Sequence, residues 1–301
     1  MIPIKHLILE GVDLAGKSTL YRALHKMTGF GYNIVDRSRL SRICYARLYG
    51  RSTERHEREA LLEEVCDANN FFVVLMPPRD VIMSRYSQRG DEFQDVASLT
   101  RLYDIFAEEV EALLGLPNVL IVRDTREAVD TAADIASVVT LYSSMSPATL
   151  GTALREWASF GSSDEVQFRL QLDVPVDHED VTIMNHVGES DYYHEILKTC
   201  EDVIQNEISG KNPYSKPQGL DSRRFYYASD TCISSVHFLP RDGDLKVRCV
   251  LRSTDAQRNG SPDLRFLAHL AASVPRTFKW DPKKISLEVQ YNSLHIRNDL
   301  V

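Results

Sequence analysis

Residues 7–20 of the chain read LILEGVDLAGKSTL, and this stretch decides the fold of the first half. Its apolar beginning is typical of a buried parallel strand. From Lys17 to Met27, apolar side chains recur on one helical face. Between strand and helix, residues 11–18 match the pattern G-x-x-x-x-G-K-[ST]. The stretch therefore predicts a phosphate-binding loop, in which backbone N–H groups at a helix N-terminus wrap a phosphate.

Within this loop each residue type has an expected task. Lys17 neutralises the β- and γ-phosphates of a nucleotide, and the Ser18 hydroxyl holds Mg²⁺. ATP and Mg²⁺ are therefore the expected cofactors. The predicted cofactor-binding set is Gly11, Asp13, Gly16, Lys17, Ser18 and Thr19. Such a loop alone does not separate a kinase from other NTPases or from a GTPase.

Strand and helix patterns alternate along the first half of the chain. Strands are expected at 6–10, 32–36, 71–76 and 118–123. Helices are expected at 17–27, 52–68, 98–114 and 125–139, the last capped by Thr125. This alternation predicts a parallel sheet with helices on both faces, an α/β domain over residues 1–142, and a linker over 142–147.

The second half has a different pattern. Residues 166–174 alternate strictly between apolar and polar, as in a half-buried strand, and 191–208 look helical. Residues 232–239 and 244–251 flank Arg241-Asp242-Gly243, a hairpin signal. Residues 261–263 open a helix, and 284–291 alternate again. The second half is therefore predicted to be an α+β domain over residues 148–301.

Composition excludes several classes of protein. A length of 301 residues suggests two domains, and 43% hydrophobic residues suffice for two cores. The net charge is −8 and neither half is basic, which excludes a large sequence-independent grip on duplex DNA but not a small nucleic-acid pocket. No apolar run reaches transmembrane length, so no membrane partner is expected. The five cysteines form no CxxC pair, so neither a disulfide framework nor a zinc site is expected, and the cytoplasm is the expected location.

Three segments of the first half resemble thymidylate kinases and the related deoxynucleoside kinases. These families carry loops close to EGxDxxGKST, an acidic-Arg pair after a later strand, and an arginine-rich lid helix. Here LILEGVDLAGKSTL supplies the loop, Asp36-Arg37 ends YNIVDR, and residues 73–93 (VVLMPPRDVIMSRYSQRGDEF) fit the lid with Arg85 and Arg89. The resemblance covers about residues 5–140, and this half is shorter than those kinases usually are.

The kinase resemblance implies roles for four residues besides Lys17. Asp36 would orient or deprotonate the acceptor oxygen or organise Mg²⁺, and Arg37 would clamp the acceptor. Arg85 and Arg89 would stabilise charge on the transferring phosphoryl group. Two plainer interpretations stay open: a surface pair at a strand end for Asp36-Arg37, and a solvated helix face for Arg85 and Arg89.

The second half, over roughly residues 190–299, resembles thymidylate synthases and pyrimidine hydroxymethylases. Their S-R-R, Cys, D-G-x-L and R-S-x-D motifs match residues 222–224, Cys232, 242–245 and 252–255 in order, and residues 292–297 resemble a later motif. The resemblance implies a homodimer and a nucleotide pocket. Its phosphate would be held by Arg223, Arg224, Arg252 and Ser253, with Asp255 and His295 supporting nucleotide and sugar. Cys232 would be the thiolate that adds to the pyrimidine.

The same half departs from that family at several positions. Ile233, His237 and Arg297 replace the expected His, Gln and Tyr, and Asp263 or Leu264 stands near the place of the uracil-reading Asn. Less chain precedes the arginine pair than the family uses for its catalytic Glu and folate-contacting Trp. Folate binding is therefore not expected, and Cys232 could equally be a buried strand cysteine.

Three functions fit these patterns. The leading hypothesis is an ATP-dependent kinase for a deoxypyrimidine acceptor, either a thymidylate-like nucleotide or 5-hydroxymethyluracil, free or in bacteriophage DNA. Its synthase-like domain would bind nucleotide or dimerise. The second hypothesis is a bifunctional deoxyuridylate methylase or hydroxymethylase plus nucleotide kinase. The third is an NTP-binding regulator that senses pyrimidine nucleotides. If the protein is phage-encoded, the expected location is the host cytoplasm.

Overall fold

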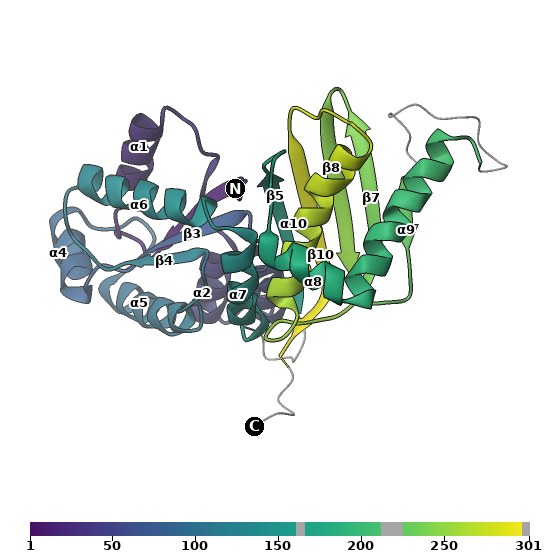
Figure 1. The fold of residues 1–301 in the computed structure, drawn as a ribbon. Coiled ribbons are helices and arrows are strands. Elements are labelled where there is room, and N and C mark those ends of the chain that lie inside the picture. The colour runs from purple at the N-terminus through teal and green to yellow at the C-terminus, as the bar shows by residue number, and fades with distance from the viewer. Residues whose placement is uncertain (161–165, 212–224, 297–301) are drawn as a thin grey trace. The chain divides into compact units, whose positions relative to one another are not determined.

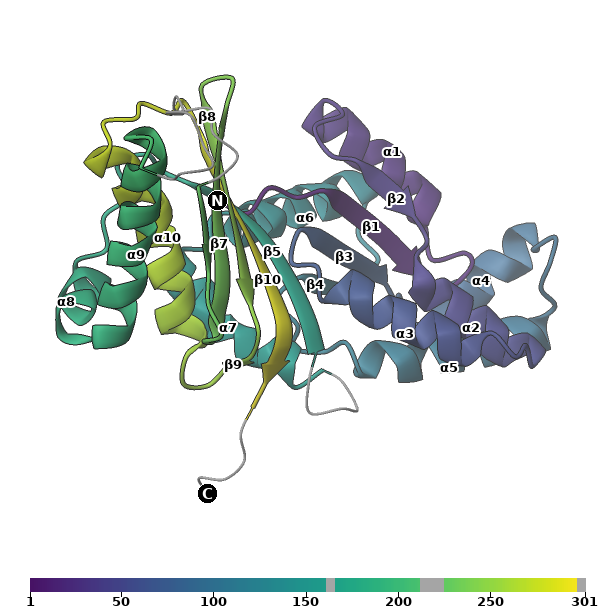
Figure 2. The ribbon, with the colours of Figure 1, turned by 90° about the vertical axis from the view of Figure 1, so that its right-hand side faces the viewer.

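Two sheets organise the chain in the computed structural model, which describes residues 1–160, 166–211 and 225–296 (Figure 1, Figure 2). Ile4–Ser144 form one compact unit, called here the N-terminal unit. Met1–Pro3 together with Met145–Val301 form the other, called here the C-terminal unit. In the described part of the chain, no helix is long and apolar enough to cross a membrane.

The sheet of the N-terminal unit has the strand order β2-β1-β3-β4, and all neighbouring strands are parallel. Its strands are β1 (His6–Gly11), β2 (Ile34–Asp36), β3 (Asn70–Leu75) and β4 (Val119–Val122). β3 is buried along its whole length and β1 from its second residue on, as expected when helices cover both faces of a parallel sheet. The predicted parallel α/β sheet is thus confirmed.

Six helices surround this sheet. They are α1 (Lys17–Thr28), α2 (Arg39–Tyr49), α3 (Glu54–Val65), α4 (Arg79–Arg89), α5 (Val96–Glu111) and α6 (Ala128–Ser143). α1 packs against α6 on one face, and α2 packs against α3 and α5 on the other (Figure 2). α4 follows Pro77 and Pro78, which end β3. The chain thus enters α1, α2 and α4 after the carboxyl ends of β1, β2 and β3.

Three sequence expectations for this unit were incomplete or wrong. No element was expected at 39–49, where α2 buries Leu40, Ile43 and Cys44 at helical spacing. Thr125 does not cap α6, which begins at Ala128 after Glu127 and continues to Ser143. Tyr142, expected in the linker, is a buried helical residue whose hydroxyl donates to the Ala68 carbonyl at 2.6 Å.

The C-terminal unit contains a mixed sheet with the order β5-β10-β8-β7-β6, and β9 pairs with β10. Its strands are β5 (Val166–Val174), β6 (Tyr226–Ala228), β7 (Ile233–Arg241), β8 (Asp244–Leu251), β9 (Thr254–Asp255) and β10 (Ile285–His295). β10 runs parallel to β8 and β9 and antiparallel to β5. β7 and β8 form the predicted hairpin, in which Asp242 and Gly243 both have positive φ, as a two-residue turn of the primed type requires.

Helices α7 (Pro147–Ala158), α8 (Val181–Glu189) and α9 (Asp191–Ile208) gather around α10 (Gly260–Thr277). α7 and α10 approach so closely that a Cβ on Gly151 would lie 2.4 Å from the Ser261 Cα. α10 is consequently the most buried helix of its unit. The predicted strand at 166–174 and helix at 191–208 are confirmed, whereas α7 and α8 were not expected.

Candidate functional site

The glycine loop, residues 11–18, joins β1 to α1 in a conformation that only particular residues adopt. Gly11 has φ 140°, and a Cβ there would lie 2.3 Å from the Leu75 carbonyl oxygen of the neighbouring strand. Gly16 has φ 103° and occupies the N-cap position of α1, where no side chain bonds to the helix. The first N–H groups of α1 therefore have no side-chain acceptor and face the loop, which is the arrangement that binds a phosphate.

Lys17 folds back over this loop. Its ammonium donates to the carbonyls of Gly11 at 2.6 Å and Val12 at 3.1 Å, and the residue is buried. Burial lowers the pKa of Lys17, and the nearby Arg37 adds to this effect, while acidic neighbours oppose it. An anion bound on the loop would relieve the desolvation of the ammonium, so Lys17 is placed to take a phosphate oxygen in exchange for the two carbonyls.

Glu10 connects the loop to α2. Its carboxylate is fully buried and accepts hydrogen bonds from the backbone N–H and the hydroxyl of Ser38 and from the same two groups of Ser41. Ser38 is the N-cap of α2, so the negative charge lies at the positive end of the helix. This cluster fixes where residues 36 and 37 leave β2 relative to the glycine loop.

Asp13 and Arg37 form an ion pair at the loop. Arg37 has a positive φ of 71° and donates from Nη2 to Asp13 Oδ1 at 2.8 Å. Tyr45 of α2 donates to Asp13 Oδ2 at 2.5 Å, and the Arg37 guanidinium carbon lies 5.3 Å from the centre of the Tyr45 ring. Burial, followed by the bond to Asp13, raises the pKa of Tyr45. The ring therefore stays a neutral donor beside the carboxylate.

Two cavities open on either side of the glycine loop. Cavity A, of about 430 Å³, extends from the loop to the residues after β4, including Asp124, Thr125 and Ala128. Cavity B, of about 510 Å³, extends from the loop toward α2 and the residues after α4. The two share five lining residues, namely Leu14, Ala15, Gly16, Thr19 and Arg89. A phosphate chain on the loop could therefore be reached from both cavities.

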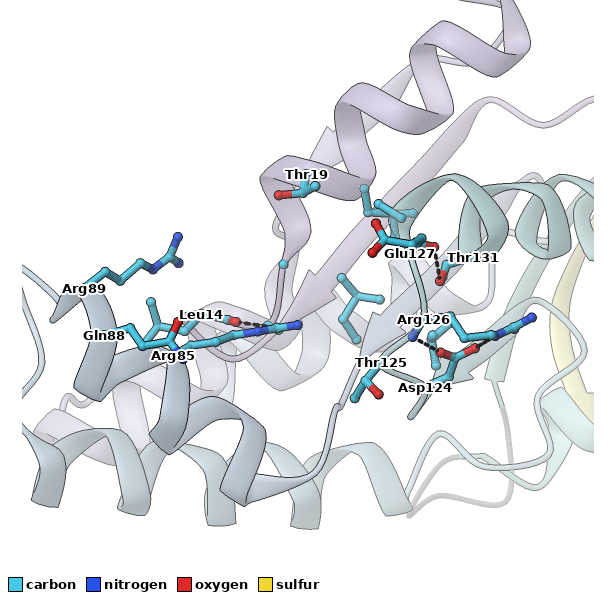
Figure 3. Close-up of a pocket in the computed structure, with 16 residues that line it drawn as sticks. Leu14, Thr19, Arg85, Gln88, Arg89, Asp124, Thr125, Arg126, Glu127 and Thr131 are labelled. Atoms are coloured by element: carbon cyan, nitrogen blue, oxygen red, sulfur yellow. Dashed lines mark hydrogen bonds and ion pairs between the residues drawn. The ribbon is translucent and has the colours of Figure 1, made fainter.

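The two candidate arginines of α4 differ in their contacts. Arg85 donates to the Leu14 carbonyl at 2.8 Å, and a Cβ on Gly16 would lie 3.6 Å from its Nη1. Figure 3 shows this side chain reaching the loop, with Asp124, Thr125 and Glu127 facing it across cavity A. Arg89 is exposed and lines both cavities. Arg85 thus contacts the glycine loop, and Arg89 lies at the border between the two cavities.

The far wall of cavity A is made rigid by a polar turn after β4. The Arg126 backbone N–H donates to Asp124 Oδ1 at 2.5 Å, and its guanidinium bonds both Asp124 and Asp134. The Arg126 backbone bond, followed by its guanidinium, holds the pKa of Asp124 below its usual value. This carboxylate is therefore ionised and already paired at neutral pH.

The residues expected to hold Mg²⁺ are compatible with that ion. Ser18 and Asp36 both line cavity B beside the loop, and Asp36 is exposed at the end of β2. No cluster of three metal-ligating His, Cys, Asp or Glu side chains occurs in the described ranges. This donor set suits Mg²⁺, which binds through one or two protein oxygens and takes its remaining ligands from phosphates and water.

In the C-terminal unit, Cys232 and Arg252 are neighbours. The Arg252 backbone N–H donates to the Cys232 carbonyl at 2.8 Å, and both residues are exposed. Cys232 directly precedes β7, so the interpretation as a buried strand cysteine is wrong. Tyr192 of α9 accepts the next backbone N–H, that of Ile233, at 3.0 Å. Cys232 is therefore exposed, and the backbone of Arg252 lies beside it.

The other synthase-like residues are only partly described. Asp255 lies opposite His295 where β9 pairs with β10, and Ser253 precedes this pair half-buried. The Asp255 carboxylate is buried, accepts the Gln257 N–H at 3.0 Å and lies 3.6 Å from the Arg258 guanidinium. Arg223, Arg224 and Arg297 lie outside the described residues. Asp255 and His295 are thus brought together, whereas the predicted arginine pair is untested.

Asp263 is buried at the start of α10. It accepts from the Tyr193 hydroxyl at 2.7 Å and from the Thr254 hydroxyl at 3.3 Å. Burial nevertheless raises the pKa of Asp263 to about 6. The carboxyl therefore links α9, β9 and α10.

The sequence analysis does not single out Glu10, Tyr45 or Gln94. Glu10 carries a usable signal, because an acid inside an otherwise apolar buried strand needs a partner. Tyr45 carries none, because α2 itself was not expected. Gln94 lies in a turn whose contacts depend on tertiary structure.

Partial likenesses to solved structures include a YorR protein and a thymidylate synthase. No protein-family model and no curated protein matches the chain. The structure of the YorR protein from Bacillus subtilis in complex with phosphorylated GDP is 23% identical, with a TM-score of 0.38 over 45% of this chain and 96% of that chain. Thymidylate synthase from T4 phage is 18% identical, with a TM-score of 0.26 over 34% of this chain and 35% of the synthase. Both TM-scores are low, so the proposals below rest on the residues of this chain.

We expect Glu10→Ala to destabilise the N-terminal unit by about 3 kcal/mol or more, because several buried donors lose their acceptor at about 1–3 kcal/mol each. Urea unfolding measures this loss. The control, Glu63→Ala, removes an exposed acid of α3 and should change stability by less than about 0.5 kcal/mol. Equal stability of the two variants would show that the Glu10 cluster does not hold α2 in place.

A second prediction concerns pH. The pKa of Asp263 is raised to about 6 in the folded chain from 3.8, so the folded state retains a proton that the unfolded state loses between these pH values. Stability from this group is therefore greatest below pH 4 and falls as the pH rises through 6. Relative to wild type, Asp263→Asn should gain about 2 kcal/mol between pH 4 and pH 7 in urea unfolding. A pH-independent difference would contradict the raised pKa.

Proposed function

We propose that the N-terminal unit is an ATP-dependent phosphotransferase for a deoxypyrimidine acceptor, either a thymidylate-like nucleotide or 5-hydroxymethyluracil, free or in DNA. One observation carries this proposal: the glycine loop is shared by two cavities. A nucleotide hydrolase needs one nucleotide cavity and a water, whereas direct transfer needs two substrates that meet at one phosphoryl group. Cavity A suits the donor nucleoside and cavity B the acceptor.

On the donor side, the loop N–H groups and the N-terminus of α1 bind the phosphate chain. Lys17 leaves the Gly11 and Val12 carbonyls for the β- and γ-phosphates. Arg85, already at the loop, and Arg89, at the border of both cavities, neutralise charge that develops during transfer. These residues make the transferring group electrophilic without any covalent intermediate on the protein.

On the acceptor side, Asp36 and the pair of Asp13 and Arg37 line the same cavity. Asp36 is exposed and has no side-chain partner among the described residues, so it is available to orient or deprotonate the acceptor oxygen. Arg37 is held by Asp13 over the Tyr45 ring, which directs its guanidinium to an anionic acceptor. Mg²⁺, held through Ser18 and Asp36, would neutralise phosphate charge when bound.

The C-terminal unit is proposed to bind a pyrimidine nucleotide or to form a homodimer. Arg252 and Ser253 offer donors for a 5′-phosphate, and Asp255 and His295 lie together beyond them. The exposed thiol of Cys232 favours a second candidate function, in which this unit is a methylase or hydroxymethylase and the protein is bifunctional. We favour binding, because the Cys-adjacent His and the uracil-reading Asn are both replaced.

Transfer of label from γ-labelled ATP tests the kinase proposal. The acceptors are thymidylate, 5-hydroxymethyldeoxyuridylate and single-stranded DNA that contains 5-hydroxymethyluracil. Wild type should phosphorylate at least one acceptor, and Lys17→Ala should lose about 100-fold or more of this activity, because the ammonium stabilises charge in the transition state.

The matched control is Lys26→Ala, which removes an exposed lysine from the last turn of the same helix and should leave turnover unchanged. Near-normal turnover in Lys17→Ala would remove the kinase assignment. Label release as free phosphate, with no labelled acceptor, would instead indicate a hydrolase or a regulator.

For the C-terminal unit, Arg252→Ala should weaken pyrimidine-nucleotide binding by about 1.5–3 kcal/mol, the value of a lost charged hydrogen bond. Cys232→Ser should leave this binding unchanged, because thiol and hydroxyl differ mainly in nucleophilicity. Calorimetry measures both. A covalent adduct on Cys232 with 5-fluorodeoxyuridylate and methylene-folate, detected by mass spectrometry, would overturn the binding role and establish the bifunctional enzyme.

A further inference from the structure

Gln94 lies in the wall of cavity B, directly after the arginine helix α4. The Asp91 carboxylate accepts the backbone N–H groups of Phe93 and Gln94, each at 2.9 Å, and so fixes this turn. The Gln94 side chain is 4% exposed although it lines the cavity. A long polar side chain held this deeply normally has all its hydrogen bonds satisfied.

Only one end of the Gln94 amide has a partner. Its Nε2 donates to the Tyr49 hydroxyl at 2.8 Å, which uses one of the two hydrogens on that nitrogen. The buried Oε1 has no hydrogen-bond partner among the described residues. An unsatisfied buried carbonyl is costly, so the amide is built to accept an N–H that an occupant of the cavity brings.

The neighbouring side chains select a flat occupant. Phe93, next in the turn, is 83% exposed, far more than a phenyl ring normally is, and it also lines cavity B. Tyr45 and Tyr49 stack at 6.2 Å with their planes 11° apart, and the Arg51 guanidinium lies 5.1 Å from the Tyr49 ring centre. These contacts restrain the half-exposed Tyr49 ring, whose hydroxyl accepts from the amide of Gln94.

We propose that Gln94 is a specificity-determining residue that reads the ring edge of a pyrimidine-2,4-dione, with Oε1 accepting the ring N3–H. This inference rests on the proposed function, in which cavity B holds the acceptor. The remaining Nε2 hydrogen donates to a carbonyl that flanks N3, so one amide satisfies two adjacent groups of the base. Phe93 covers a face of the ring, because aromatic stacking accepts any planar base and leaves discrimination to the amide.

Binding of two matched probes tests this reading of the base. Calorimetry compares thymidine 5′-monophosphate with its N3-methyl analogue, which lacks the N3–H. The same comparison is made with single-stranded oligonucleotides that carry one 5-hydroxymethyluracil, either unmodified or N3-methylated. Wild type should prefer the unmethylated member of at least one pair by about tenfold or more, since an unsatisfied buried acceptor remains when N3 is methylated.

Gln94→Leu should bring this preference to within about twofold, because the leucine removes the acceptor and tolerates the methyl group. The control Gln205→Leu changes an exposed amide of α9 that lines neither cavity and should keep the wild-type preference. The wild-type comparison needs no variant, so it decides the question even if Gln94→Leu does not fold.

Equal affinity of wild type for both members of each pair, or no binding of any probe, would overturn the role of Gln94. An unchanged preference in folded Gln94→Leu would do the same. Phosphotransfer from γ-labelled ATP is measured on the same samples. Selective binding without phosphotransfer would support the reading of the base and reject the kinase proposal, so the two failures are distinguishable.

Discussion

The buried carboxylate of Glu10 is the constraint on which the N-terminal unit depends. The glycine loop follows the carboxyl end of β1, and Tyr45 of α2 contacts this loop through Asp13. Glu10 connects β1 to α2, because its carboxylate oxygens accept hydrogen bonds from Ser38 and Ser41 at the first turn of α2. An acid in a strand interior is tolerated only with such partners. The geometry of cavity B follows from this one cluster.

A loop shared by two cavities explains the distribution of charge around it. Positive groups lie on both sides of the loop: Arg85 lines cavity A, Lys17 lines cavity B, and Arg89 lines both. Acidic groups are either paired, as Asp13 is with Arg37, or placed at a strand end, as Asp36 is. In the proposed function, this separation would keep positive charge beside the phosphates and leave the Asp36 carboxylate for the acceptor oxygen.

Periodicity and glycine spacing predicted the parallel sheet, the loop and the strand–helix pattern around β5 and α9, because those signals are local. The prediction of a linker at 142–147 was wrong at Tyr142. This residue lies in α6, and its hydroxyl donates to the carbonyl of Ala68, which is distant in sequence. Cavity B was not predictable for the same reason. It depends on α2 and on the turn that holds Gln94. α2 has local signals in its N-cap Ser38 and its C-cap Gly50, but tertiary contacts decide which side chains of α2 and of this turn meet at the cavity.

The most direct test of the central claim, that the glycine loop joins a donor and an acceptor cavity, is a crystal structure with adenosine and thymidine linked through five phosphates. We expect the phosphates on the loop N–H groups beside Lys17, the adenosine near Thr125 in cavity A, and the thymidine against Tyr45 and Gln94 in cavity B. Phosphates bound away from the loop, or both nucleosides in one cavity, would contradict it.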